Sequence, residues 1–280
     1  MNIVQIHHKS KFYLDSVRSP RFPHATVNQA INTAIHTIVN DRYDAIRKAD
    51  REGTFQVSQR LRDEIYTLVY PGTVTPVLGT KRFDIKTAYP DYWLLASMKV
   101  TISGKEINTI PLTYDEQNVI ENNPFARPSI EYPERIYRIE AYDGVTINHG
   151  ALGNLTAGNI YYIKEPVLVN LGTVNSSGTF SNGDQIICYM DGQIGYYDGG
   201  GNLYNTVTLL EGEELTIDTP GGYAGILTGI YVTGFTNCDL PSMLHEEICK
   251  EAAKVLSGTV ENYDRVKDLD QQQNLGAPQR

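Results

Sequence analysis

The sequence contains little cysteine and no long apolar run, and each shortage excludes a class of protein. Its three cysteines, Cys188, Cys238 and Cys249, are too few and too scattered for a disulfide framework or a zinc knuckle, so we expect free buried thiols. No stretch approaches the roughly 20 consecutive apolar residues that span a bilayer. Residues 1–12 are polar and basic where a secretory signal needs an apolar core. We therefore expect a protein that stays inside the cell that makes it, unless it leaves by lysis or within a particle.

The composition is that of a globular protein with an unusual aromatic content. Hydrophobic residues make up 41% and charged residues 20% of the 280 positions, enough for one sizeable core or a core with an inserted lobe. Tyrosine dominates the aromatics, with 19 Tyr against 7 Phe and 1 Trp. Because tyrosine joins a large apolar face to a hydroxyl that tolerates water, this usage favours wet interfaces.

The net charge of −9 is unevenly distributed along the chain. Residues 1–70 carry ten Lys and Arg against seven Asp and Glu, whereas residues 151–237 carry only Lys164 against eight acids. An acidic segment of this kind repels nucleic acid, so direct wrapping by DNA is not favoured.

Helical periodicity marks both ends of the chain. Apolar residues at helical spacing from Val27 to Ile46 predict a helix that starts near Thr26. Gly53 interrupts this period, which restarts at Val57 and stops before Pro71, so we expect two antiparallel helices. A further helix is predicted after Pro241, with the buried stripe Leu244, Ile248, Ala252, Val255 and Leu256, before a loose tail at 274–280.

Alternating patterns in the middle of the chain predict hairpins. One runs from Trp93 to Ile110 and turns at Ser103-Gly104, and another runs from Arg135 to Ile147. We expect the second to turn at Asp143-Gly144, because both central residues of a type I′ turn need positive φ. Between them, Thr113 and Glu116 form a capping-box pattern that predicts a short helix ending before Asn123-Pro124.

Residues 151–237 form a separate compositional zone that holds 16 of the 24 glycines. Asn175–Gly178 is typical of a turn, and Asp191-Gly192 indicates a hairpin between the runs 186–190 and 193–197. Short strands joined by glycine turns favour a small antiparallel sandwich or barrel-like lobe.

These patterns predict an α+β fold with three segments. Residues 1–150 are expected to form a helical hairpin with an antiparallel β core. Residues 151–237 are expected to form an inserted, acidic all-β lobe. Residues 238–280 are expected to supply a C-terminal helix and a polar tail that complete the first domain.

One motif invites a catalytic interpretation. His245-Glu246-Glu247-Ile248-Cys249 is similar to the helical zinc-protease pattern, because positions i and i+4 project from one helix face. Cys249 stands where the second histidine belongs, and only Cys238 offers a third ligand, so a partly exposed histidine and a buried thiol are favoured. His7-His8 is expected in a flexible N-terminal segment. We predict no catalytic, metal or cofactor-binding residues.

Two stretches carry a family resemblance. The first is Pro111–Glu116 through Asn123-Pro124-Phe125 to Tyr137; the second is Asn237–Pro241 followed by His245–Ile248 and the polar 262–274 segment. Together they resemble structural proteins of tailed bacteriophages, particularly the ring-forming connector subunits between portal and tail of crAss-like phages.

The resemblance implies a non-enzymatic subunit of the virion, made in the cytoplasm of the bacterial host. It would form a homo-oligomeric ring in the head–tail connector or tail, contact the portal and neighbouring connector or tail proteins, and pass DNA through its lumen as cargo, with no membrane partner. The candidate interface residues are Tyr43, Arg47, Tyr66, Tyr114, Phe125, His245 and Tyr263.

Two other functions remain open from the sequence. The first is a carbohydrate- or receptor-binding module in the 151–237 lobe, where Tyr189, Tyr196, Tyr197 and Tyr204 can stack on sugar rings. The second is a metal hydrolase centred on His245, which requires bound zinc.

Overall fold

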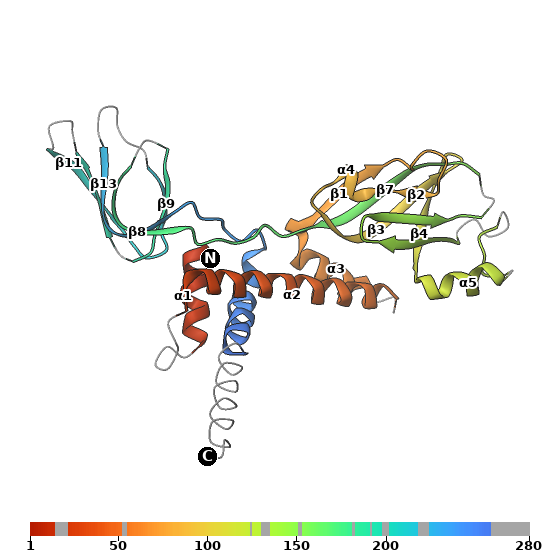
Figure 1. Cartoon of the computed structure of the whole chain (residues 1–280), viewed down its shortest axis with the longest axis horizontal. Helices are drawn as coiled ribbons and strands as arrows, with labels where there is room; N and C mark the ends of the chain where they lie inside the picture. Colours follow the sequence, from red (N-terminus) through yellow and green to blue (C-terminus); the bar gives the residue numbers. More distant parts are fainter. Residues whose placement is uncertain are drawn as a thin grey trace, which may run out of the picture. The chain divides into compact units, whose positions relative to one another are not determined.

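The fold comprises two compact units. The computed structural model describes residues 1–14, 22–51, 55–123, 125–129, 135–150, 153–180, 183–190, 192–197, 202–217 and 224–258. Unit 1 combines Met1–Phe55 with Pro166–Arg280, and unit 2 is Gln56–Glu165. Helices and mainly antiparallel sheets occur in the same chain, which confirms the α+β class (Figure 1). In the described part of the chain, no helix has the length and apolar character needed to span a membrane.

Three helices of unit 1 pack together. They are α1 (Ile3–Tyr13), α2 (His24–Arg51) and the helix over 245–258, which follows the short helix η2 (Ser242–Leu244). The Arg42 guanidinium on α2 donates to the Glu247 carboxylate at 2.6 Å, and the Cys249 thiol lies 3.7 Å from the Ile6 carbonyl oxygen on α1. The predicted helix 26–46 and C-terminal helix are confirmed, and their apolar stripes are buried except for Val255, which is half-buried.

Helix α1 was not predicted from the sequence, although a signal for it is present. The Asn2 side chain accepts from the backbone of Gln5, and the Gln5 side chain accepts from the backbone of Asn2. This is a capping box with asparagine as the N-cap. The expectation of a flexible segment around His7-His8 is therefore wrong.

The β lobe of unit 1 is an antiparallel six-stranded sheet. Its core contains Phe180, Ile186, Cys188, Ile194, Leu209, Ile217 and Tyr231. The strand order is β11-β10-β13-β9-β12, and β8 pairs with β13. The strands are β8 (Thr173–Phe180), β9 (Gln185–Cys188), β10 (Gly192–Tyr197), β11 (Leu203–Leu209), β12 (Glu214–Thr216) and β13 (Ala224–Thr233).

Two sequence predictions for this lobe are wrong. The expected hairpin around Asp191-Gly192 does not form, because β13 lies between β9 and β10 and pairs with both. The Asp191-Gly192 turn signal is local, so it cannot show that a strand from later in the chain lies between β9 and β10. Asn175–Gly178, expected as a turn, lies inside β8, where Gly178 makes room for the Tyr231 hydroxyl.

Unit 2 is built on a curled seven-stranded sheet of order β1-β7-β3-β4-β5-β6-β2. All pairs are antiparallel except β4 with β5, whose parallel connection contains α5 (Tyr114–Asn122). The strands are β1 (Val69–Val74), β2 (Arg82–Phe83), β3 (Tyr92–Ile102), β4 (Lys105–Leu112), β5 (Ile136–Ala141), β6 (Gly144–Asn148) and β7 (Leu155–Lys164). Helices α3 (Phe55–Glu64), η1 (Tyr66–Leu68) and α4 (Ile85–Ala88) complete the ordered elements.

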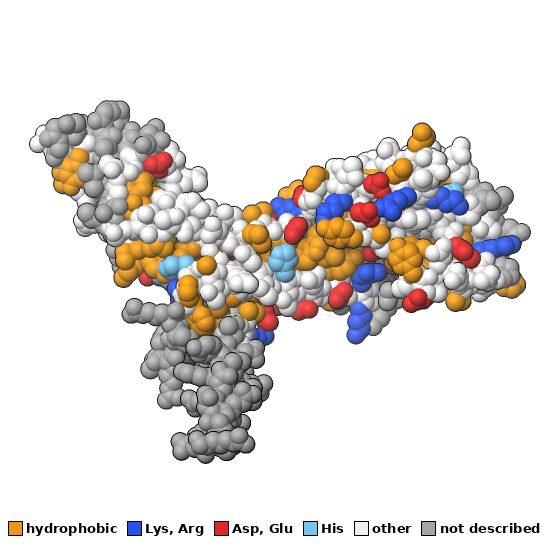
Figure 2. All heavy atoms as spheres, viewed as in Figure 1, with side chains coloured by type: hydrophobic (Ala, Val, Ile, Leu, Met, Phe, Trp, Pro, Cys, Tyr) orange, Lys and Arg blue, Asp and Glu red, His pale blue; other side chains and the backbone are white. Residues whose placement is uncertain are grey.

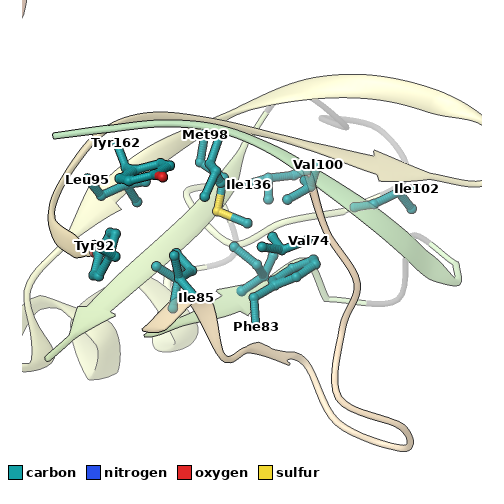
Figure 3. Packing of buried hydrophobic residues seen from close by; sticks show 13 residues of the cluster. Val74, Phe83, Ile85, Tyr92, Leu95, Met98, Val100, Ile102, Ile136 and Tyr162 are labelled. Carbon is teal, nitrogen blue, oxygen red and sulfur yellow. The ribbon is translucent and has the colours of Figure 1, made fainter. Parts of the chain in front are cut away.

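The core of unit 2 lies inside the curl of this sheet. Phe83 from the short strand β2 packs beside Val74 of β1, and Met98 of β3 reaches the same cluster (Figure 3). The remaining core residues come from β3, β5, β6, β7 and α4. They are Ile85, Tyr92, Leu95, Val100, Ile102, Ile136, Val145, Ile147, Ile160 and Tyr162.

Both predicted hairpins of unit 2 form, but for one of them the predicted turn is wrong. Ser103 and Gly104 have φ of 50° and 79°, as a type I′ turn requires. In the second hairpin Ala141 pairs with Gly144, so Tyr142 and Asp143 form the turn. Gly144 is not at positive φ; a Cβ there would lie 2.1 Å from the Phe83 carbonyl oxygen. This glycine therefore serves a close backbone approach rather than a turn conformation.

The predicted domain boundaries differ from the two units in three respects. Residues 238–280, expected to complete the domain of the β core, belong to unit 1 together with the β lobe. Strand β7 lies in the segment 151–237, yet it pairs with β1 and β3 and so belongs to the seven-stranded sheet. Helix α2 belongs to unit 1, whereas α3 continues into unit 2. The composition of residues 151–237 hid the difference at β7, because the polar, glycine-containing start of β7 is similar to the lobe that follows.

Candidate functional site

His245 and Cys249 are packed into unit 1 by groups of the chain itself. The Nε2 of His245 lies 2.9 Å from the Leu240 carbonyl oxygen, and its Nδ1 lies 2.9 Å from the amino group of Met1. Because a carbonyl only accepts, Nε2 carries the proton and Nδ1 accepts from the amine. His245 is 5% exposed and Cys249 is buried. Both ring nitrogens are thus engaged within the chain, which corrects the expectation of a partly exposed histidine.

Burial acts on the two thiols near His245, Cys238 and Cys249. Burial raises the pKa of Cys238 to about 11 and also raises the pKa of Cys249, so both favour the protonated form. Among the described residues, no three His, Cys, Asp or Glu side chains are grouped to hold a metal ion. The zinc interpretation therefore has no geometric support in this part of the chain.

A histidine cluster lies where α1, α2 and the β lobe meet. It comprises His7 and His8 on α1 and His24 at the start of α2, with Tyr189 after β9. The Tyr189 ring contacts the His8 and His24 rings edge-on, with centroids 4.6 and 5.8 Å apart. His8 also pairs with Glu211. This histidine cluster docks the N-terminal helix onto the lobe.

His7 is the buried member of the histidine cluster. Its Nε2 lies 2.7 Å from Asn28 Oδ1, which also accepts from the Leu171 backbone N–H at 3.1 Å, so Nε2 is the protonated nitrogen. Its Nδ1 is buried and has no hydrogen-bond partner among the residues that the structure describes. Burial lowers the pKa of His7 to about 4, with a further lowering from Lys11, while the Asn28 hydrogen bond acts in the opposite direction.

The candidate interface residues divide by exposure. Tyr66, Tyr114 and Phe125 are 62%, 65% and 76% exposed. Tyr43 is 6% exposed, because it lies on the apolar stripe of α2, and so it and His245 belong to the interior rather than to an accessible surface. Arg47 is half-buried, with its guanidinium carbon 5.5 Å from the Tyr43 ring centroid. Tyr263 lies outside the described residues.

Helix α5 exposes Tyr114 and Val119, and Phe125 is exposed just after it. None of the nine residues of this helix is buried, and Val119 is 68% exposed. A shallow groove of about 600 Å³ is lined by Asn118, Val119, Asn122, Asn123 and Phe125. We call this groove, with Tyr114, the α5 surface. Figure 2 shows apolar side chains on several parts of the same unit.

Polar contacts hold α5 against the sheet. The Glu116 carboxylate accepts from the Thr113 backbone N–H at 3.1 Å, which confirms the predicted capping box. Asn148 donates to Glu121 at 3.1 Å, and the Tyr137 hydroxyl donates to the Ala126 carbonyl oxygen at 2.9 Å. The Glu121 contact ties the C-terminal end of α5 to β6, while Tyr114 and Val119 stay exposed and Ile120 is half-buried.

A second groove, of about 560 Å³, lies on the outer face of the sheet of unit 2. Thr73 donates to Asn159 at 3.2 Å, and Asn159 donates to Glu106 at 2.8 Å, so a polar chain joins β1, β7 and β4 across the intervening strand β3. Tyr161 is 52% exposed beside this chain, and Lys99 also lines the groove. We call it the sheet groove.

Comparison with known proteins does not assign the chain. No protein-family model matches it, and no curated protein is significantly similar to it. Of the tyrosines expected to bind sugar in the lobe, Tyr189 packs against the His8 and His24 rings, and the side chains of Tyr196 and Tyr204 lie outside the described part.

Proposed function

We propose that this chain is a non-enzymatic structural subunit of a phage virion that forms an oligomeric ring in the head–tail connector or tail. The observation that carries the proposal is the α5 surface. A nine-residue helix with no fully buried residue gains little from core packing, and isolated helices shorter than about 12 residues are marginal in water. A partner that covers Tyr114, Val119 and Phe125 would stabilise it by removing apolar area from water.

The charge distribution supports the same proposal. The acidic 151–237 segment repels DNA, which suits a wall along which DNA slides as cargo rather than a surface that binds it. In this proposal the direct partners are other copies of the chain, together with the portal and neighbouring connector or tail proteins.

The test is the mass and shape of the full-length chain. We expect mass photometry to give one discrete multiple of 31.3 kDa, and negative-stain electron microscopy to show closed rings. Mass spectrometry of purified phage particles should find the chain in fixed copy number. A chain that stays monomeric at every concentration and is absent from particles would refute the proposal.

The sheet groove favours carbohydrate binding as a second candidate function. An exposed tyrosine ring beside amide, carboxylate and ammonium groups matches the apolar face and hydroxyl groups of a sugar. This location is in unit 2, not in the lobe where the sequence suggested it.

A glycan array with the full chain tests this second function. We expect binding that Tyr161→Ala lowers at least tenfold, while Tyr142→Ala, which removes a tyrosine that is 80% exposed elsewhere in unit 2, leaves it unchanged. Equal binding by the two variants, or a silent array, would count against the sheet groove.

A further inference from the structure

The connection between β1 and β2 presents one leucine to solvent on a tight turn. The Val77 carbonyl oxygen accepts from the Thr80 backbone N–H at 2.9 Å and from its hydroxyl at 2.8 Å. Gly79, at the third position, has φ of 74°, as in a type II turn. Leu78 occupies the second position and is 98% exposed. We call Val77–Lys81 the Leu78 turn.

The base of the Leu78 turn is also fixed. The Val77 backbone N–H donates to the Arg82 carbonyl oxygen at 2.8 Å, and the Ile147 N–H donates to the Lys81 carbonyl oxygen at 2.8 Å. The turn is thus anchored to the sheet on both sides. Because the backbone of the turn is already fixed, it loses little conformational entropy when the Leu78 side chain enters a partner.

The α5 surface offers a complementary recess on the same unit. Its groove is shallow and is lined by the exposed side chains of Val119 and Phe125, so it offers an apolar face wide enough to meet the end of a turn. A single exposed leucine is ordinary in a soluble protein. An exposed leucine on a rigid turn and an uncovered apolar groove on one unit together suit a contact between copies.

Charge favours the same pairing and fixes its direction. Helix α5 carries Asp115, Glu116 and Glu121 and no lysine or arginine. Asp115 lies on the helix face of Val119 and Asn122, because positions i, i+4 and i+7 align. The Leu78 turn brings Lys81, which is exposed. Arg127 lies beyond Phe125 at the other end of the groove and would repel Lys81. We therefore expect Lys81 at the end that carries Asp115.

We propose that the Leu78 turn of one copy inserts into the α5 surface of a second copy. Leu78 packs against Val119 and Phe125, and Lys81 faces Asp115. The two patches differ, so the contact is heterologous and repeats from copy to copy until it closes a ring. This inference rests on the proposed ring and names the residues that join its neighbours.

Cysteine pairs test the contact directly. Leu78→Cys and Val119→Cys are prepared as separate full-length variants and oxidised alone and as a mixture. We expect disulfide-linked dimers from the mixture and none from either variant alone, and a ladder of higher species from the double variant. The wild-type chain is the control, since Cys188 and Cys249 are buried and the pKa of Cys238 is raised to about 11. Linking of Leu78→Cys to itself, or none in the mixture, would overturn the contact.

Charge and apolar variants separate this contact from the ring itself. Leu78→Asp is expected to leave the chain monomeric, whereas Leu168→Asp, at a leucine 63% exposed in unit 1, is expected to assemble normally. Lys81→Glu should weaken association about threefold, and adding Asp115→Lys should restore it. If the wild-type chain and Leu78→Asp assemble alike, the contact is wrong but the ring stands. If the wild-type chain is itself monomeric and the mixture does not link, both are wrong.

Discussion

Replacing Phe83 with alanine is expected to lower the free energy of unfolding of unit 2 by about 4 kcal/mol, the cost of removing a large buried aromatic side chain. Phe83 is fully buried. Its ring packs over Gly158 of β7, where an added Cβ would lie 3.2 Å from the ring edge. Its backbone pairs with Val145 of β6. Phe83 thus joins β2 and β7, which lie far apart in the sheet order. Alanine at this position would leave a cavity between them.

The single tryptophan makes this loss measurable in unit 2. Trp93 lies in β3, so its fluorescence during urea unfolding reports on the sheet that contains Phe83. We expect the transition midpoint to fall while the slope stays unchanged. Phe12→Ala is the control, because Phe12 is 73% exposed on α1 and should change the transition by less than about 0.5 kcal/mol. A loss below about 1 kcal/mol for Phe83→Ala would show that the ring does not bridge these strands.

Strand β2 also shows which parts of the fold the sequence can predict. The helix over 24–51 and the hairpin of β3 with β4 were predictable, because each shows its own hydrophobic period over many residues. Two residues cannot show a period, so β2 gave no signal although Phe83 is central to the core. The order of strands in the β lobe failed for a related reason: β13 is distant in sequence from the strands that it separates.

The candidate site was predictable to a similar extent. Tyr66, Tyr114 and Phe125 were expected at an interface and are exposed, whereas Tyr43 and His245 are buried. Residue type suggested all five as interface residues, but whether a side chain is exposed depends on how neighbouring elements pack against it. The Leu78 turn was missed because its short sequence carries only one glycine as a turn signal. Its proposed role as a contact also depends on the α5 surface, which is formed elsewhere in unit 2.

Acid is expected to destabilise unit 1 through His7. The pKa of His7 is lowered by burial from 6.5 to about 4, so the unfolded chain binds a proton more readily than the folded chain. Stability from this residue is therefore full above pH 6.5, falls as the pH drops, and is lost below pH 4. The difference corresponds to about 3 kcal/mol. Urea unfolding followed by far-ultraviolet circular dichroism at several pH values between 7 and 4 measures it.

The variant His7→Gln separates this histidine from the others. Glutamine can still donate to Asn28 but does not titrate, so we expect the loss of stability between pH 6.5 and 4 to shrink by most of those 3 kcal/mol. Part of the loss remains, because burial also lowers the pKa values of His24 and His245, which lie in the same unit. His36→Gln is the control, since residue 36 lies about 18 Å along α2 from His24. An equal acid loss in wild type and His7→Gln would show that His7 is protonated in the folded chain as easily as in the unfolded one, and the docking of α1 on the lobe would then not depend on a neutral imidazole.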